Sequence, residues 1–281
     1  MRVVSVVSTK GGVGKTTVAA NLGGLLADAG LRVLLLDLDS QPTLSSYYAL
    51  NQKADAGAYE LIALNLATPA RIVSRTVITG LDLILSNDDQ GRLSTLLLHA
   101  PDGRLRLRNL LDDFRPNYDL LLIDTQGARN VLLEMAILAS DLALSPITPE
   151  MLAAREMRRG TLKLLSELEP FRYLGIDPPP LRLLLNQVNV NRVDTRMIIR
   201  SLRETFAEAT NISVLDTVIP DRVAYLNAAS LGLPAHRIDT RPSSKRRRSQ
   251  CALEIMQALA IELFPEWREA ISSVMRCAEP R

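Results

Sequence analysis

A glycine-rich loop near the amino terminus is the segment of this sequence best suited to chemistry. It reads Ser8-Thr-Lys-Gly-Gly-Val-Gly-Lys-Thr-Thr17 and lies between an apolar run and an apolar helical pattern. Glycines let successive backbone N–H groups point at phosphate oxygens, and a helix amino terminus adds partial positive charge. We expect Lys15 to reach the β- and γ-phosphates and the Thr16 hydroxyl to ligate Mg²⁺. The residues predicted to contact the nucleotide are Lys10, Gly11, Gly12, Val13, Gly14, Lys15, Thr16 and Thr17.

Two further apolar runs end in aspartates that could take part in the same chemistry. The run Val33–Asp37 is followed by Asp39, and the run that begins at Tyr118 ends at Asp124. Ligands of doubly wound sheets bind beyond the carboxyl ends of the strands. We expect Asp124 to bind Mg²⁺, through water. Strand alternation puts Asp37 and Asp39 on one side, where a carboxylate holds Mg²⁺-bound water or orients the attacking water, although either could be a turn residue.

The elements that position these residues alternate along the chain. Apolar strands followed by longer helical patterns predict parallel βαβ units, with helices on both faces of the sheet. The predicted strands are Val3–Ser8, Val33–Asp37, Leu81–Ser86, Leu120–Asp124, Leu142–Pro146, Leu181–Val188 and Thr217–Ile219. The predicted helices are Lys15–Ala29, Gly91–Leu98, Leu105–Phe114, Val131–Ala139, Glu150–Leu168, Val193–Ala209, Arg222–Leu231 and Ser249–Phe264. We expect one α/β domain over residues 1–281, doubly wound and mostly parallel, with a tail at 265–281.

The glycine-rich loop departs from the strict P-loop pattern, because Thr9 stands where that pattern has glycine and Lys10 adds a cation. In this it resembles the ParA/MinD family of deviant Walker A ATPases, whose signature matches Lys10–Thr17 almost residue for residue. The resemblance implies ATP and Mg²⁺ as cofactors and a dimer in which Lys10 touches the partner subunit's nucleotide. The family's Asp-x-Asp-x-Gln motif also matches Asp37, Asp39 and Gln41. This match implies that Asp39 serves hydrolysis together with Lys10 and Lys15.

The resemblance extends over about residues 1–265 and is closest to the short, Soj-like ParA proteins, since nothing here precedes the first strand. It implies that Asn186, at the end of a strand, and Pro220, in a Val-Ile-Pro motif, lie beside the adenine. After Asp124-Thr125 the family often has prolines, whereas this chain has Gln126 and Gly127. The Mg²⁺ role of Asp124 stays intact, but the conformation of the following loop is left open.

Composition excludes several classes of protein. Of the 281 residues, 47% are hydrophobic and 23% are charged, which is unlike a disordered chain, a collagen or a coiled-coil rod. No run approaches about 18 consecutive apolar residues, and the sequence before the loop is too short for a secretory signal, so we expect a cytoplasmic protein. Cys251 and Cys277 cannot form a metal cage and are expected to stay reduced.

The carboxyl-terminal half is basic, which suits a polyanionic partner. Residues 1–150 hold 13 basic and 16 acidic side chains, whereas residues 151–281 hold 20 and 15. One set of arginines recurs at helical spacing and would form a stripe along one helix face, suited to DNA phosphates without base reading. The alternative is a solvated face paired with Glu204 or Glu208. The candidate DNA-binding residues are Arg155, Arg158, Arg192, Arg196, Arg200, Arg203, Arg222, Lys245, Arg246 and Arg247.

The leading functional prediction is a ParA-type ATPase in DNA partition. Its ATP-bound homodimer would bind nonspecific double-stranded DNA and a ParB-like protein would stimulate slow hydrolysis, giving a nucleoid-associated protein. A MinD-like membrane-positioning ATPase is the alternative, but the last helical stretch carries Glu266 and Glu269 beside Arg268, so no stable membrane association is expected. Iron–sulfur carriers and nitrogenase-type reductases need cysteine pairs that bridge a cluster, and they are disfavoured because Cys251 and Cys277 are far apart in sequence and lie near the tail. A ligase resembling dethiobiotin synthetase stays open.

Overall fold

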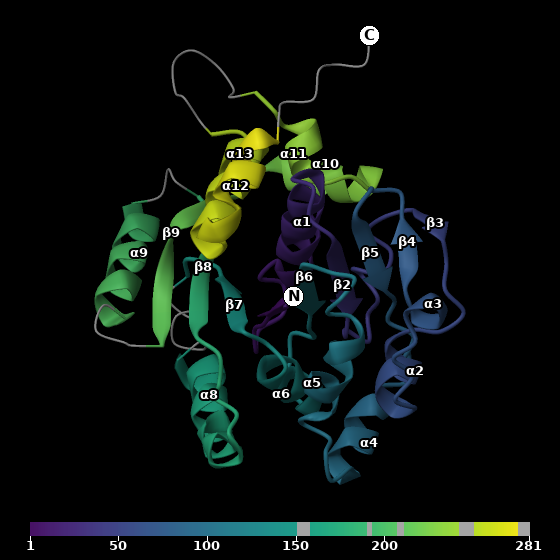
Figure 1. Cartoon of the computed structure of the whole chain (residues 1–281). Coiled ribbons are helices and arrows are strands. Elements are labelled where there is room, and N and C mark those ends of the chain that lie inside the picture. The colour runs from purple at the N-terminus through teal and green to yellow at the C-terminus, as the bar shows by residue number, and fades with distance from the viewer. Residues whose placement is uncertain (151–157, 190–192, 207–210, 242–249, 275–281) are drawn as a thin grey trace.

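A nine-stranded sheet runs through the described part of the chain (Figure 1). The computed structural model describes all residues except 151–157, 190–192, 207–210, 242–249 and 275–281. The strand order is β3-β4-β5-β2-β6-β1-β7-β8-β9, and every pair from β5 to β9 is parallel, while β3 and β4 add an antiparallel edge. The strands are β1 (Arg2–Val6), β2 (Val33–Asp37), β3 (Leu50–Gln52), β4 (Ser74–Thr76), β5 (Leu81–Ile84), β6 (Leu120–Asp124), β7 (Leu142–Ile147), β8 (Leu181–Val188) and β9 (Ile212–Pro220).

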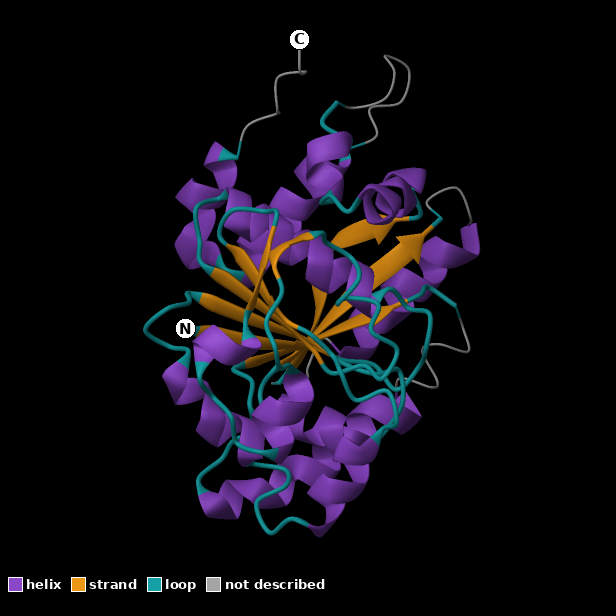
Figure 2. Ribbon diagram, turned by 90° about the vertical axis from the view of Figure 1, so that its right-hand side faces the viewer, coloured by secondary structure: helices purple, strands orange, loops and turns teal. Residues whose placement is uncertain are grey.

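Helices cover both faces of the twisted sheet, as Figure 2 shows. The α-helices are α1 (Lys15–Asp28), α2 (Ala58–Ala63), α3 (Pro69–Ile72), α4 (Arg92–His99), α5 (Arg106–Leu110), α6 (Val131–Leu138), α8 (Lys163–Leu168), α9 (Val193–Phe206), α10 (Val223–Leu231), α11 (Ala235–Ile238), α12 (Ala252–Leu263) and α13 (Arg268–Ser273). Shorter turns of 3₁₀-helix span Leu111–Asp113, Glu169–Leu174 and Pro265–Trp267, and a π-helical turn spans Arg158–Leu162. None of the described helices combines the length and hydropathy needed to cross a bilayer.

The central strands are buried on both sides because a helical layer lies against each face. Every residue of β2 and β6 is buried. Along β2, Leu35 belongs to the core beneath α1 and α12, whereas its neighbours Leu34 and Leu36 belong to the core beneath α2, α4, α5 and α6. A third core lies beneath α8 and α9. This continuous apolar composition is what a parallel sheet with two covered faces requires.

The predicted fold class is confirmed, with differences at the edges of the sheet. The short strands β3 and β4 were not predicted, because their few residues have mixed polarity and carry no periodic signal. The predicted strand at 217–219 is the end of β9, which starts at Ile212. Of the predicted helix 150–168, residues 151–157 lie outside the described residues, 158–162 form the π-helical turn and 163–168 form α8. A Cβ on Gly160 would lie 2.2 Å from Thr9 Oγ1, so the π-helical turn lies close to the glycine-rich loop.

The strand order creates a place for a ligand. From β1 the chain runs through α1 to β2, beyond β6, whereas from β6 it runs through α6 to β7, beyond β1. The loops at the carboxyl ends of β1, β2 and β6 consequently converge, and ligands of open α/β sheets bind at such a change of direction. The glycine-rich loop and both predicted carboxylate motifs follow these three strands.

Candidate nucleotide site

The glycine-rich loop turns sharply between β1 and α1. Gly12 and Gly14 have φ values of 75° and 86°, a left-handed conformation that favours glycine. Gly14 immediately precedes α1, whose first residue is Lys15. A Cβ on Gly14 would lie 2.3 Å from the amide nitrogen of Asn186, so the loop also needs glycine for close approach. The backbone N–H groups that follow open the first turn of α1, as an anion site requires.

Two amide side chains from the end of β8 support the loop. Asn186 Nδ2 donates to the carbonyl of Val13 at 2.7 Å, and Gln187 Nε2 donates to the carbonyl of Gly12 at 3.2 Å. Asn186 was predicted to contact adenine, and in the structure one of its polar atoms is already committed to the loop. Gln187, with φ 56°, was not predicted, although the adjacent Asn-Gln pair at a strand end was visible in the sequence. Both residues fix the loop before any ligand arrives.

Lys15 lies among carboxylates at the floor of the phosphate pocket. The pocket is lined by Gly11, Gly12, Gly14, Lys15, Thr16, Thr17, Asp39, Gln41, Gln126, Gly127, Ala128 and Gln187. Lys15 is only 7% exposed. Burial lowers the pKa of its ammonium group, while the charges of Asp124 and Asp39 act in the opposite direction. A buried cation that lines a pocket beside a glycine-rich loop is the kind of group that binds phosphate oxygens, and the contact of Lys15 with the β- and γ-phosphates stays a prediction.

Thr16 and Asp124 form the pair expected of a magnesium site. Thr16 Oγ1 donates to Asp124 Oδ2 at 2.6 Å, and Asp124 is fully buried. Its second oxygen, Oδ1, has no hydrogen-bond partner among the described residues. Burial raises the pKa of Asp124 to about 7, and the charges of Asp37 and Asp39 act in the same direction. A hydroxyl beside a carboxylate with a buried, unpartnered oxygen is a donor set that fits Mg²⁺, which prefers oxygen ligands and keeps water in its shell.

The two aspartates after β2 have separate environments. Strand β2 ends at Asp37, so strand alternation stops there and Asp39 lies in the following loop. Asp37 is fully buried, accepts from the backbone N–H and hydroxyl of Ser45 at 2.8 and 2.7 Å, and accepts from Asp39 N at 3.1 Å. Burial raises the pKa of Asp37 to about 6. Asp39 lines the phosphate pocket, where its carboxylate accepts from Gln41 N at 3.0 Å. Only Asp39 therefore faces the predicted phosphates directly.

The loop after β6 lies directly on the glycine-rich loop. A Cβ on Gly127 would come within 2.8 Å of the Cα of Gly11, so this position requires glycine. Gln126, one residue earlier, lines the phosphate pocket, and its amide donates to Ser40 Oγ at 3.3 Å. The Gln-Gly pair that departs from the resembled family thus has a structural reason for its glycine. The glutamine was not predicted to take part in the site.

Lys10 lies at the rim of the loop and contacts a carboxylate of its own subunit. Its Nζ is 3.4 Å from Glu150 Oε2, and both side chains are partly exposed, at 37% and 65%. The backbone N–H of Lys10 donates to Ser8 Oγ at 3.1 Å. Glu150 follows β7, so it approaches the loop from the side opposite to Asp39. In contrast to Lys15, this lysine is partly exposed at the surface of the chain.

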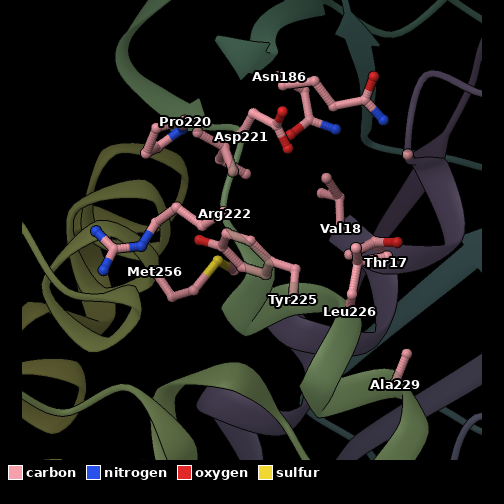
Figure 3. Close-up of a pocket in the computed structure, with 13 residues that line it drawn as sticks. Thr17, Val18, Asn186, Pro220, Asp221, Arg222, Tyr225, Leu226, Ala229 and Met256 are labelled. Carbon is pink, nitrogen blue, oxygen red and sulfur yellow. The ribbon is translucent and has the colours of Figure 1, made fainter. Parts of the chain in front are cut away.

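A second pocket adjoins the phosphate pocket on the side of β8 and β9 (Figure 3). It lies between α1, α10 and α12, and its lining includes Val18, Leu226, Ala229 and Met256 as well as Asn186 and the predicted Pro220. Apolar walls with a few polar groups are typical of a site for a flat ring. The hydroxyl of Tyr225, which also lines this pocket, is buried and has no hydrogen-bond partner among the described residues. The structure thus offers a space for a nucleotide base next to the phosphate loop.

Arg222 lies in this pocket rather than on an open surface. Its side chain is 19% exposed, it pairs with Asp239 at 2.8 Å, and it donates to the carbonyl of Gln250. A guanidinium engaged in this way is not presented to a DNA backbone, which differs from the expectation for this residue. The reason is that Arg222 immediately precedes α10, which packs against α11, and Asp239 immediately follows α11.

The other predicted DNA-binding residues divide into those that the structure describes and those that it does not. Arg196, Arg200 and Arg203 are exposed on α9. Arg200 pairs with Glu204 at 2.8 Å, and Arg203 donates to the carbonyls of Leu215 and Asp216. The backbone of Arg158 is described, within the π-helical turn. Arg155, Arg192, Lys245, Arg246 and Arg247 lie outside the described residues.

Comparisons with known proteins agree with this geometry. The model of a family described as "AAA domain" matches residues 1–172. The chromosome partitioning protein ParA of Caulobacter vibrioides is 29% identical over 263 residues, which cover 91% of this chain and 94% of that protein. The chromosome-partitioning ATPase Soj of Thermus thermophilus is 33% identical over 237 residues, covering 83% and 86%. The ATP complex of an McdA variant from Cyanothece superposes with a TM-score of 0.75 at 21% identity, covering 100% of this chain and 99% of that one.

The match in sequence and the match in fold concern the same elements. The family model covers the glycine-rich loop, the aspartates after β2 and the strand that ends at Asp124. The relatives extend the similarity over most of the chain. The chain therefore belongs to the ParA/Soj group of deviant Walker A P-loop ATPases.

Proposed function

We propose that this protein hydrolyses ATP to ADP and phosphate, with Mg²⁺, and that the cycle serves DNA partition. The observation that carries the proposal is the arrangement of Lys15, Thr16, Asp39 and Asp124 around one pocket beneath a preformed glycine loop. The proposed ATPase domain spans residues 1–281. Part of the expected tail belongs to it, because Ile271 is fully buried in the core beneath α1 and α12.

The proposed chemistry is in-line attack of water on the γ-phosphorus. Backbone N–H groups of the glycine loop and the ammonium of Lys15 stabilise the charge that develops on the phosphate oxygens, in a pocket where they are already oriented. Asp39 orients the attacking water from the opposite wall. Thr16 and Asp124 would hold Mg²⁺, which neutralises phosphate charge when bound. Asn186 and Pro220 would contact the adenine, together with the unpartnered hydroxyl of Tyr225.

The proposed switch is an ATP-dependent homodimer. Lys10 supports it, because its partly exposed ammonium lies at the rim of the loop, 3.4 Å from the carboxylate of the exposed Glu150. Exposed ion pairs contribute about 0–1 kcal/mol, so this pair offers little resistance to movement of Lys10 toward another anion. In the proposed dimer that anion is the nucleotide of the partner subunit.

The proposed dimer binds nonspecific double-stranded DNA through exposed arginines. Among the described candidates, Arg196 and Arg200 suit this role best, since both are exposed on α9 and Arg200 pairs with Glu204 of the same helix. A ParB-like protein is the proposed stimulator of hydrolysis, and cytoplasmic, nucleoid-associated localisation follows from DNA binding. The names of the Caulobacter and Thermus relatives, both chromosome-partitioning proteins, support this assignment.

A MinD-like membrane function receives less support from the last helices. An interfacial helix needs an apolar face that is free to enter the headgroup region. Here Ile271 of α13 is fully buried, and the ring of Trp267 lies 4.9 Å from that of Phe264. The apolar side chains of this stretch therefore pack on the protein itself.

The proposal is tested by measuring oligomeric state and hydrolysis together. Light scattering with MgATP, MgADP and no nucleotide should show a dimer with MgATP only, and phosphate release should be slow and dependent on Mg²⁺. Asp39→Ala should bind MgATP, hydrolyse it far more slowly and accumulate the dimer. Unchanged turnover in Asp39→Ala would show that Asp39 takes no part in hydrolysis. A wild-type protein that stays monomeric at saturating MgATP would contradict the proposed ATP-dependent dimer.

A further inference from the structure

Gln126 lines the phosphate pocket together with Asp39, yet it is not among the residues proposed to contact the nucleotide. It is the second residue after Asp124. Its side chain makes two hydrogen bonds in opposite directions. The amide nitrogen donates to Ser40 Oγ at 3.3 Å, and the amide oxygen accepts from Asn130 Nδ2 at 3.0 Å. Gln126, which lies in the loop after β6, thus connects that loop to the loop after β2.

The far end of this connection is anchored in a helix. Asn130 is the residue that caps α6, and its Oδ1 accepts from Leu133 N at 2.9 Å. A capping side chain of this kind holds both the helix start and its own rotamer. The hydrogen bonds therefore run from the first turn of α6 through Asn130 and Gln126 to Ser40, which is the next residue after Asp39.

The near end of the connection is the loop that carries Asp39. The backbone of Asp39 is held by two hydrogen bonds: its N–H donates to Asp37, and its carbonyl accepts from Ser86 Oγ at 2.6 Å. Ser45 closes the same inner network, because it donates to Asp37 and accepts from Ser86 N at 2.8 Å. Gln126 reaches this loop from the loop after β6, through its bond to Ser40.

We propose that Gln126 is a positioning residue for hydrolysis, which holds Ser40 and thereby orients the Asp39 carboxylate toward the γ-phosphate. The inference rests on the proposed role of Asp39. A misplacement of a catalytic group by about 1 Å can lower the rate of reaction about a hundredfold. ATP is proposed to be held by the backbone of the glycine loop, so its affinity should not depend on where the Asp39 carboxylate lies. Gln126 should therefore affect turnover and leave ATP affinity nearly unchanged.

The test uses Gln126→Met, which keeps the length of the side chain and removes both hydrogen bonds. We expect kcat at saturating MgATP to fall about tenfold or more, with the Kd for MgATP within about twofold of wild type. Ser40→Ala removes the same bond from its other end and should lower kcat in the same direction. In the double variant the two effects should not multiply, because both changes remove one interaction.

Gln257→Met is the matched control. Gln257 also makes two hydrogen bonds, to the carbonyls of Ile271 and Val274, but lies on α12 and lines neither pocket. Its kcat should equal that of wild type. If Gln126→Met and Ser40→Ala both keep wild-type kcat while Asp39→Ala is slow, the inference is wrong and the proposed function stands. If Asp39→Ala turns over normally, the proposed role of Asp39 fails and the inference fails with it, while the proposed ATP hydrolysis stands. Should Gln126→Met not fold, Ser40→Ala alone decides.

Discussion

The phosphate pocket and the arginine face of α9 differ in how far the protein commits its side chains before a ligand binds. In the pocket, Thr16 is bonded to Asp124, and the loop carbonyls of Gly12 and Val13 are bonded to β8. On α9, Arg196 and Arg200 are exposed, and Arg200 pairs with Glu204 four residues later. The side chains of the pocket are held in fixed positions that suit one ligand geometry, whereas the arginines of α9 supply positive charge without fixed positions.

This difference separates two kinds of function. Stabilisation of a transition state requires oriented groups in a water-poor pocket, and such a pocket tolerates few substitutions. Attraction of a DNA backbone requires only positive charge within reach of phosphates, and its strength depends on salt. We therefore expect single substitutions in the pocket to lower turnover strongly and substitutions on α9 to change binding gradually.

The largest effect is expected for Lys15→Ala. The phosphates lose their principal cation inside a buried pocket, so hydrolysis should become undetectable and ATP should bind at least about tenfold more weakly. Phosphate release and calorimetric titration with MgATP measure the two effects. Lys163→Ala, an exposed lysine on α8, is the control and should behave as wild type. Residual hydrolysis above about a tenth of the wild-type rate would contradict a preorganised pocket.

Lys10→Ala should separate nucleotide binding from assembly. Because Lys10 lies at the rim of the loop and its ion pair with Glu150 is exposed, the Kd for MgATP should change less than about threefold. The variant should nevertheless remain monomeric with MgATP and hydrolyse it little. Light scattering at several protein concentrations measures the dimer. A normal ATP-dependent dimer in this variant would exclude the contact across subunits.

A graded effect is expected for Arg196→Ala combined with Arg200→Ala. Removal of one phosphate contact should reduce the salt slope of DNA binding by about 0.9, equally on unrelated sequences, while dimerisation and hydrolysis stay normal. Mobility shifts with MgATP at several salt concentrations measure the slope. The matched control is Arg115→Ala with Arg172→Ala, two arginines in surface ion pairs elsewhere. A wild-type salt slope in the Arg196→Ala, Arg200→Ala variant would show that the α9 arginines form a solvated face that does not contact DNA. The cluster Lys245–Arg248 would then be the next candidate for DNA binding.

The smallest effect concerns stability. Burial raises the pKa of Asp124 to about 7. The ionised carboxylate is thus disfavoured in the folded state, by a cost that is absent below about pH 4, the unfolded value, and complete above about pH 7. The Tm of the nucleotide-free protein should therefore fall as pH rises from about 5 to 8. Asp124→Asn should flatten this fall and raise Tm by a few degrees at pH 8, while it abolishes Mg²⁺-dependent hydrolysis. A lower Tm with an unchanged pH slope would contradict the buried charge.

The sequence indicated those residues of the candidate site whose type and position in the chain are both constrained. Gly14 needs a positive φ and close approach, Lys15 opens α1 directly after the glycine-rich loop, and Asp124 ends an apolar strand, so each leaves a pattern in the sequence. The roles of these residues toward a nucleotide stay predictions. The fold class followed from the same strands. The amide side chains that brace these residues were not predicted, because Gln126 and Gln187 act through contacts between segments far apart in the chain.

Surface residues were harder to interpret for a related reason. The spacing of arginines on α9 predicted that they share an exposed face, whereas Arg222 was a candidate because it follows the Val-Ile-Pro motif, and its side chain pairs with Asp239. The polarity of an isolated residue does not reveal an ion-pair partner 17 positions later in the chain. The short edge strands β3 and β4 were not predicted, because each has three residues, which are too few to show a periodic pattern.

The proposal that the phosphate pocket controls the DNA surface is tested most directly by DNA binding of the purified protein with MgATP, with MgADP and without nucleotide. Two unrelated duplexes are compared at one salt concentration. We predict binding with MgATP alone, equal on both duplexes, and absent in Lys10→Ala although that variant still binds MgATP. DNA binding that is independent of nucleotide, or binding by Lys10→Ala as strong as by wild type, would contradict this control.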